Sequence, residues 1–146
     1  MNLTETEKAY LAGLFDGEGT VGYYLKKAIG YHRAQIAIYN SDPRIMEWIR
    51  SRIPFGNIVT NKISRHRGWA WMVTSNAQVT EFLVTIRPYL IIKANQVDLL
   101  LSLWDAEQKI RGSKKIVKLT SDHLALREMA ARQLKLSKTA YFECIH

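Results

Sequence analysis

Two carboxylates, Asp16 and Glu18, lie two residues apart at and just beyond the end of a segment with a helical pattern. Thr4 or Thr6 can cap this helix, which we expect to cover about residues 7–16, and glycines follow its last turn. An acidic side chain at a helix C-terminus interacts unfavourably with the helix dipole. Carboxylates in that place therefore indicate charge that is kept for a ligand cation, and solvated surface charge is the alternative interpretation.

The same helix carries a stripe of small residues. On a helical wheel the large apolar side chains gather on one side, and the opposite side carries Ala9, Ala12, Gly13, Asp16 and Gly17. A glycine inside a helix costs about 1 kcal/mol relative to alanine, so its presence needs a reason. Small residues four apart let two helix backbones approach closely, and a helix that is apolar on both sides is buried on both sides. We expect the second neighbour to be the same helix of another subunit, with close packing inside one chain as the alternative.

The segments after this helix alternate between strand and helix patterns. Apolar and polar residues alternate in two pairs of strands, and helical spacing separates and follows these pairs. We expect strands at residues 20–28, 33–39, 57–64 and 69–74, and helices beginning near 43, at 76–86, at about 94–110 and from 121 or 122 to about 134. This order predicts one α+β domain over residues 1–146, with an antiparallel sheet whose second face is open to solvent or a ligand.

The charge of the chain favours an anionic partner. Lysine and arginine number 21 against 13 aspartates and glutamates, which gives a net charge of +8. Nucleic acid is the first partner class that this balance indicates, and a merely basic soluble protein is the alternative. No apolar run approaches the roughly 20 residues that span a membrane. One cysteine, a polar start and no targeting signal lead us to expect an intracellular protein without an intrachain disulfide or a structural zinc site.

Residues 11–19, Leu-Ala-Gly-Leu-Phe-Asp-Gly-Glu-Gly, resemble the LAGLIDADG motif of homing endonucleases, with the hydrophobic, small and acidic positions in register. The αββαββα order over roughly residues 5–110 is also similar to that family. The resemblance implies a curved four-stranded antiparallel sheet with additional C-terminal helices. It also implies a site-specific endonuclease that hydrolyses phosphodiester bonds of double-stranded DNA and works as a homodimer with paired motif helices. A monomer with two motifs is disfavoured, because the chain holds one motif and half the length that such a protein needs.

The resemblance places a divalent metal at the end of the motif. In the family, the acidic residue next to the last glycine binds the catalytic metal, which implies that Glu18, with the adjacent Gly17, is the metal ligand here. The implied ion is Mg²⁺, with Mn²⁺ as a substitute, bound beside the dimer axis. Many members have aspartate at this position, so the longer glutamate arm changes the expected metal geometry. Asp16 matches the earlier acid of the motif, whose implied role is more structural.

Three further residues correspond to active-site residues of the family. Asn40, after the second strand, resembles a polar residue that holds a water near the metals. Arg44 resembles a basic residue at the rim of the active site, and Lys93 resembles the catalytic-site lysine. The resemblance implies that Lys93 stabilises phosphate charge or helps to polarise the attacking water. Ordinary surface positions are the alternative for Arg44 and Lys93.

The strand faces opposite the core are expected to bind DNA. Arginine, lysine, glutamine and asparagine read base edges in the major groove, although polar alternation on a strand is also typical of simple solvation. The expected DNA-reading positions are Gly22, Tyr24, Lys26, Arg33, Gln35, Ala37, Asn57, Asn61, Ala70 and Met72. The positions expected to contact phosphates are Arg65 and Arg67 at a hairpin tip and Lys114 and Lys115 in a loop. The expected partner is a duplex with a long pseudo-palindromic target.

Two other functions of the same fold stay open. An RNA-binding maturase would help an intron to fold without cutting, and a catalytically inactive protein of this fold would act as a DNA-binding regulator. The presence of Glu18, Lys93 and Asn40 together favours the nuclease over both alternatives.

Overall fold

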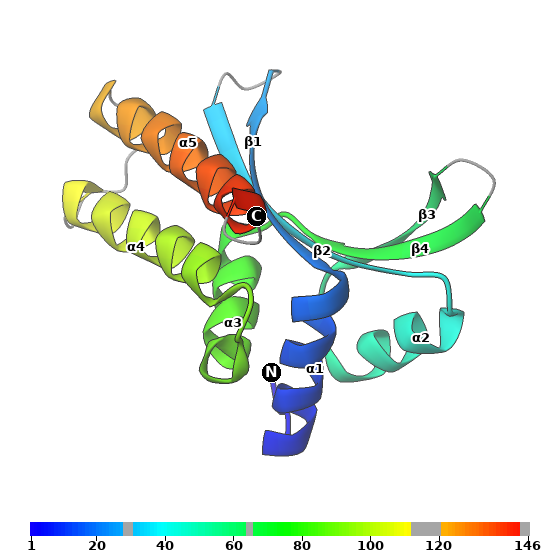
Figure 1. Cartoon of the computed structure of the whole chain (residues 1–146). Coiled ribbons are helices and arrows are strands. Elements are labelled where there is room, and N and C mark those ends of the chain that lie inside the picture. The colour runs from blue at the N-terminus through cyan, green and yellow to red at the C-terminus, as the bar shows by residue number, and fades with distance from the viewer. Residues whose placement is uncertain (28–30, 64–65, 112–120, 144–146) are drawn as a thin grey trace. The chain divides into compact units, whose positions relative to one another are not determined.

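The structure is a computed structural model that describes residues 1–27, 31–63, 66–111 and 121–143. Its elements are α1 (Glu5–Glu18), β1 (Gly19–Lys26), β2 (Tyr31–Asn40), α2 (Pro43–Arg52), β3 (Asn57–Ile63), β4 (His66–Val73), α3 (Asn76–Ile86), the 3-10 turn η1 (Arg87–Tyr89), α4 (Ala94–Arg111) and α5 (Ser121–Glu143) (Figure 1). The four strands form one antiparallel sheet in the order β1-β2-β4-β3. The predicted α+β class and the αββαββα order are confirmed, with α4 and α5 as the additional C-terminal helices.

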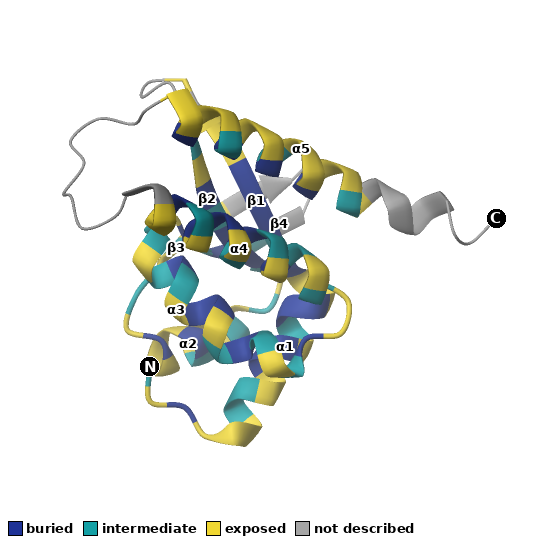
Figure 2. Ribbon diagram, turned by 90° about the vertical axis from the view of Figure 1, so that its left-hand side faces the viewer, coloured by how far each residue is buried: buried dark blue, intermediate teal, exposed yellow. Residues whose placement is uncertain are grey.

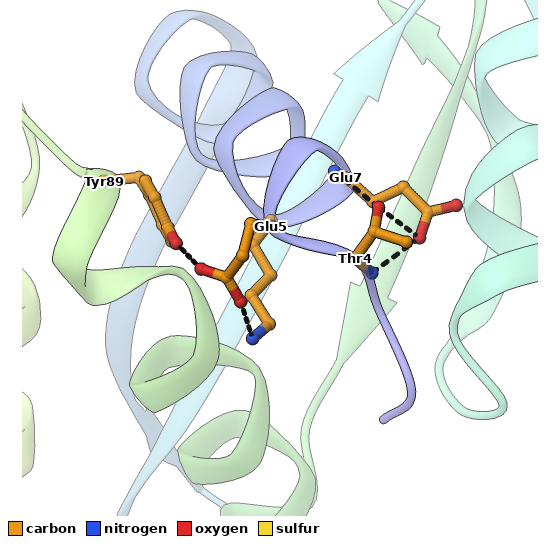
Figure 3. A network of polar contacts seen from close by, with 5 residues as sticks. Thr4, Glu5, Glu7 and Tyr89 are labelled. Carbon is orange, nitrogen blue, oxygen red and sulfur yellow. Dashed lines mark hydrogen bonds and ion pairs between the residues drawn. The ribbon is translucent and has the colours of Figure 1, made fainter.

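Helix α1 begins at a capping box and is tied to η1 in its first turn. The Thr4 hydroxyl accepts a hydrogen bond from the Glu7 N–H at 3.2 Å, and the Glu7 carboxylate accepts one from the Thr4 N–H at 2.9 Å. The Glu5 carboxylate accepts hydrogen bonds from the Tyr89 hydroxyl and from the Lys8 ammonium, the latter at 2.6 Å (Figure 3). The start of α1 is therefore fixed both by its own cap and by η1.

Helix α1 ends at Glu18, two residues beyond the predicted end at Asp16. Gly19 leaves the helix in an extended conformation, with φ −84° and ψ 158°, and its N–H donates to the Phe15 carbonyl. A Cβ atom on Gly19 would lie 2.4 Å from the Phe15 ring. The close approach of β1 to the last turn therefore requires Gly19, whereas Gly17 stays inside the helix.

The chain divides into two compact units, of which the first comprises residues 1–22 and 34–94. Its core contains an aromatic cluster in which the Phe82 ring of α3 lies 5.5 Å from Phe15 of α1 and 5.0 Å from Trp71 of β4, between ring centroids. Ile38 of β2 pairs in register with Trp71 and is fully buried. Helices α1 and α3 therefore cover the sheet face that carries Trp71, which leaves the opposite face of these strands uncovered by them.

The second unit comprises residues 23–33 and 95–146, and its described part is the outer end of the β1–β2 hairpin with α4 and α5. Figure 2 shows buried residues along one side of α5 and exposed residues along the other. The buried apolar residues of this unit include Tyr23, Val97, Leu100, Leu103, Trp104, Ala130 and Leu134. α5 continues to Glu143, beyond its predicted end near residue 134. No helix in the described ranges is both long enough and apolar enough to cross a membrane.

Candidate active site

Asp16 is buried in the last turn of α1 and is engaged by three backbone N–H groups. Its Oδ2 accepts from Ile91 at 2.8 Å and from Ile92 at 3.2 Å, and its Oδ1 accepts from Lys93 at 2.9 Å. These donors form the turn that leads into α4. The Asp16 carboxylate therefore holds this turn against the end of α1, within the first unit of the chain.

Lys93 is brought to the end of α1 by the same turn. Its ammonium donates a hydrogen bond to the backbone carbonyl of Asp16. Burial lowers the pKa of Lys93, and the negative charges of Asp16 and Glu18 oppose that shift. A cation at a helix C-terminus is stabilised by the helix dipole. The structure therefore brings Lys93 within electrostatic reach of Glu18, although the two residues are far apart in the sequence.

Glu18 is the last residue of α1, and its side chain is exposed. Within the described ranges, its carboxylate makes no hydrogen bond or ion pair. Gly17, the other expected metal ligand, is also exposed in this last turn, where helix carbonyls have no intrahelical partner. The end of α1 therefore has oxygen atoms that accept no hydrogen bond from the described part of the chain.

These oxygen atoms fit a hard divalent cation that takes part of its shell from elsewhere. Among the described residues, no group of three or more His, Cys, Asp or Glu side chains gathers as a metal site. Magnesium commonly binds one or two carboxylates and completes its octahedron with waters and substrate phosphates. Glu18 satisfies that requirement, whereas Asp16 is a poor second ligand because its oxygens already accept backbone hydrogen bonds.

Asn40 and Arg44 are connected through Asp42 at the start of α2. The Asn40 Oδ1 accepts from the Asp42 N–H at 2.8 Å, and Asp42 caps α2 by accepting from the Arg44 N–H at 2.9 Å. The Arg44 guanidinium also binds both Asp42 oxygens, with Nη2 at 2.5 Å from Oδ2. This pairing lowers the pKa of Asp42 to about 2 and raises the pKa of Arg44. The ion pair between Asp42 and Arg44 was not predicted, although an N-cap aspartate two residues before an arginine is a recognisable signal.

The places of Asn40 and Arg44 relative to Glu18 differ. β1 begins directly after Glu18, and β2 ends at Asn40. Consecutive antiparallel strands place the start of the first beside the end of the second, so Asn40 lies at the same end of the hairpin as Glu18. The Arg44 side chain is 86% exposed, and it forms an ion pair with Asp42. The described contacts therefore do not join Arg44 to Glu18 or Lys93.

The small stripe of α1 divides into a buried part and an exposed part. Ala12 is fully buried and Asp16 is 9% exposed, so these expected interface residues face the interior of their own chain. Ala9, Gly13 and Gly17 are exposed. A Cβ atom built on either glycine meets nothing within 4 Å. Fewer residues of the stripe are therefore exposed than the helical wheel predicted. The exposed part has free space beside both glycines within the described chain.

The expected DNA-reading residues also differ in exposure. Tyr24, Arg33 and Asn57 are exposed, Gln35 and Met72 are half-buried, and Gly22, Ala37 and Ala70 are buried. Lys26, Asn61 and Arg67 lie on described strands, but their side chains are outside the described structure, as are residues Arg65, Lys114 and Lys115 altogether. Gly22, Ala37 and Ala70 therefore expose little surface on the strand face that we expected to bind DNA, and the DNA contacts of this face stay predictions.

The strand register explains why Ala37 and Ala70 are buried. Ala37 pairs with Met72, and Ala70 pairs with Tyr39 on one side and Val59 on the other. Small side chains between larger neighbours are covered by them. Val59, which is 41% exposed, and the half-buried Tyr39 therefore present surface on this face that sequence reasoning missed. Their alternation with the buried residues of the same strands was the available signal.

Comparisons with known proteins find the same fold in solved structures. No protein-family model and no curated protein sequence matches the chain. The homing endonuclease I-CvuI, in complex with its target, superposes with a TM-score of 0.72 and 18% identity, over 90% of this chain and 82% of that one. An archaeal intron-encoded homing endonuclease complexed with DNA gives 0.70 and 15%, over 91% and 84%. The LAGLIDADG homing endonuclease I-SmaMI, bound to cleaved DNA, gives 0.68 and 21%, over 90% of this chain and 44% of that one.

These likenesses agree on the architecture. Each joins almost the whole of this chain to a homing endonuclease, with an identity of 21% or less. At such identities they establish the fold and leave function to be argued from the site. The chain therefore has the fold of LAGLIDADG homing endonucleases, as the resemblance of residues 11–19 implied.

Proposed function

We propose that this chain, which has the fold of LAGLIDADG homing endonucleases, is a site-specific endonuclease that cuts double-stranded DNA as a homodimer. The end of α1 carries the proposal, because Glu18 presents there a carboxylate that no described residue binds, and Lys93 presents an ammonium group. Hydrolysis of a phosphodiester needs a positioned cation and positive charge near the phosphate. Glu18 would bind such a cation and Lys93 would supply the positive charge, so this site would need no serine or histidine nucleophile.

The proposed cofactor is Mg²⁺, with Mn²⁺ as a substitute. Glu18 and the Gly17 carbonyl would hold the ion, which when bound supplies a Lewis acid and an activated water. Structures of I-CvuI with DNA were obtained in the presence of Ca, and in the presence of Mg with the DNA not cleaved, so a divalent ion is compatible with this fold. Lys93 would place positive charge beside the phosphate, and Asn40 would hold a water at the same hairpin end. Arg44 would first have to release Asp42 to act at the rim.

The exposed small face of α1 supports the homodimer. Ala9, Gly13 and Gly17 present a surface with no large side chain, so the backbone of a second α1 can approach closely. Such pairing would place two copies of Glu18 beside the dimer axis. The match to 44% of the I-SmaMI chain is consistent with this, since one copy of the present chain corresponds to about half of that protein.

Duplex DNA is the proposed partner, and the neighbouring structures supply independent support. The homing endonucleases with this fold were solved in complex with DNA. The net charge of +8 favours binding to phosphates. The exposed side chains of Tyr24, Arg33 and Asn57 are available to contact the grooves, with the half-buried Gln35 and Met72. Two copies would read the two halves of a long pseudo-palindromic target.

The experiment that tests this proposal is cleavage of a library of random duplexes by the whole protein with magnesium, followed by sequencing of the cut ends. We expect cuts at one recurring pseudo-palindromic sequence, and no cuts with the Glu18→Gln variant. Tight binding to a duplex that is never cut would instead favour a DNA-binding regulator. Binding to structured RNA alone would favour a maturase.

A further inference from the structure

A buried ion pair in the second unit has no part in the proposed chemistry. Arg127 of α5 binds the Glu107 carboxylate of α4 with two nitrogens, Nε to Oε1 and Nη2 to Oε2, the latter at 2.9 Å. Arg127 is 5% exposed and Glu107 is 6% exposed. The third guanidinium nitrogen, Nη1, donates to the backbone carbonyl of His32 in β2 at 3.3 Å. One side chain therefore connects α4, α5 and the β1–β2 hairpin.

The hairpin is packed at the same point by Tyr23 of β1. The Tyr23 ring stacks on the His32 ring, with centroids 5.6 Å apart and planes at 17°. Burial raises the pKa of Tyr23, and the charges of Arg127 and Glu107 act on the same phenol in opposite directions. Tyr23, His32, Glu107 and Arg127 thus form one group, which we call the hairpin clamp. Both strands of the hairpin and both long helices contribute to it.

The hairpin clamp is poorly explained by stability alone. Replacing a buried ion pair with apolar residues of similar volume is often neutral or stabilising, because two charges have been taken out of water. A forked pair of hydrogen bonds is directional, however, and it fixes one position and orientation of the guanidinium. Since Nη1 donates to the carbonyl of His32, the guanidinium also restrains the backbone next to Arg33, whose side chain is exposed.

We propose that Arg127 is a positioning residue for DNA recognition: through Glu107 and the His32 carbonyl it fixes the direction of Arg33 toward the bases. The proposal rests on the proposed function, since it assigns the outer hairpin to base reading. It places a determinant of sequence specificity on α5, on a side chain that is itself too buried to touch DNA.

The test uses a variant that removes the fork and keeps the volume. Glu107→Leu with Arg127→Met replaces the pair by apolar side chains, and we expect its melting temperature to stay near that of the wild type. Arg132→Met is the matched control, because Arg132 forms an exposed pair with Glu128 at 2.9 Å on the same helix. Arg127→Lys is a second variant, which keeps the charge but loses the fork and the reach to His32.

The first readout is sequence discrimination, measured by cleavage of targets randomised at each position. Arg33→Ala and Asn57→Ala identify which positions depend on the hairpin and which on β3. We expect the double variant to lose roughly 5-fold or more of the discrimination at the positions that depend on Arg33, and little at those that depend on Asn57. Unchanged discrimination at the Arg33 positions, or an equal loss at both sets, would overturn the proposal.

The second readout needs no DNA and separates this inference from the proposed function. Hydrogen exchange of the backbone amides of residues 31–33 should become faster in the double variant and in Arg127→Lys, and stay unchanged in Arg132→Met. Equal exchange in all variants would show that Arg127 does not fix the hairpin. If the wild type cuts no duplex but its hairpin amides respond as expected, the proposed function fails and the structural part of the inference stands.

Discussion

A carboxylate and a cation lie near each other in two places in this protein, in opposite environments. At the end of α1, Lys93 gives its hydrogen bond to a backbone carbonyl, and the Glu18 carboxylate stays exposed and unbonded within the described ranges. Between α4 and α5, Arg127 and Glu107 are both buried and bind each other through a fork. The charges of Glu18 and Lys93 therefore stay available to a ligand, whereas Glu107 and Arg127 bind each other, and Arg127 also binds the hairpin.

This difference separates residues that could do chemistry from residues that position others. A metal and a phosphate can reach Glu18 without displacing a partner in the described part of the chain. Nothing comparable can reach Glu107, because its oxygens are filled and its surface is covered. Asp16 resembles Glu107 in this respect, although it lies two residues from Glu18.

We expect the largest effect on stability when one partner of the buried ion pair is removed and the other stays. Arg127→Met leaves the Glu107 charge buried without its partner and should lower the free energy of unfolding by about 3–5 kcal/mol. Arg132→Met removes an exposed pair and should cost less than about 1 kcal/mol. Urea denaturation measures both. Equal losses would contradict the contrast between buried and exposed pairs.

The losses of stability on removing the two motif carboxylates, Asp16 and Glu18, should differ by a smaller amount. Asp16→Ala leaves the N–H groups of Ile91, Ile92 and Lys93 without the acceptor of their part-buried hydrogen bonds, and we expect a loss of about 3 kcal/mol. Glu18→Ala removes an exposed side chain and should change stability by less than about 0.5 kcal/mol. Urea unfolding of the two variants side by side checks this. A Glu18→Ala loss as large as that of Asp16→Ala would show that Glu18 is structural.

Gly13 allows the subunit interface to be tested without damage to the monomer. A Cβ on Gly13 meets nothing within 4 Å, and leucine is a better helix former than glycine, so Gly13→Leu should keep or raise the stability of one chain. Self-association should weaken by about 10-fold or more, because the larger side chain separates the paired backbones. Light scattering across a concentration series measures the change, with Arg132→Met as the control. A wild type that is monomeric even on its target DNA would contradict the homodimer.

The smallest effect concerns the pair at the start of α2. Arg44 holds the pKa of Asp42 at about 2, so Arg44→Ala should raise that pKa toward the ordinary value of about 4. Because the folded pKa lies below the unfolded one, the contribution of the pair is present above about pH 4 and is lost as the pH falls through 2. NMR titration of the Asp42 carboxyl group reports the shift directly. An unchanged pKa would show that the capping N–H, and not Arg44, sets it.

Much of the fold could be predicted from periodicity. Alternation identified all four strands, and the large apolar residues of α1 correctly predicted its buried side, as the fully buried Leu11 and Phe15 show. The end of α1 was placed too early because Gly17 looked like a helix stop. The residue that actually requires glycine is Gly19, and its reason is contact with Phe15, which local sequence patterns do not show.

The site was less predictable, since it depends on contacts between distant segments. The sequence does not show that the backbone of residues 91–93 returns to Asp16, so Asp16 was placed in the subunit interface. The helical wheel also included Ala12 in the small stripe, whereas Ala12 is buried inside its own chain. The roles assigned to Glu18 and Lys93 stay predictions, but the structure brings both to one helix end.

The most direct test of the central claim is the separation of cleavage from binding at Glu18. On one target duplex, cleavage is measured with magnesium and binding with calcium, for the wild type, Glu18→Gln and Glu18→Asp. We expect Glu18→Gln to cut slower by on the order of a thousandfold, as when a group that stabilises transition-state charge is removed. Its binding should persist or tighten, because a negative charge near phosphates is lost. Glu18→Asp should keep measurable activity, since the charge remains. Full cleavage by Glu18→Gln would contradict the assignment of this carboxylate to the active site.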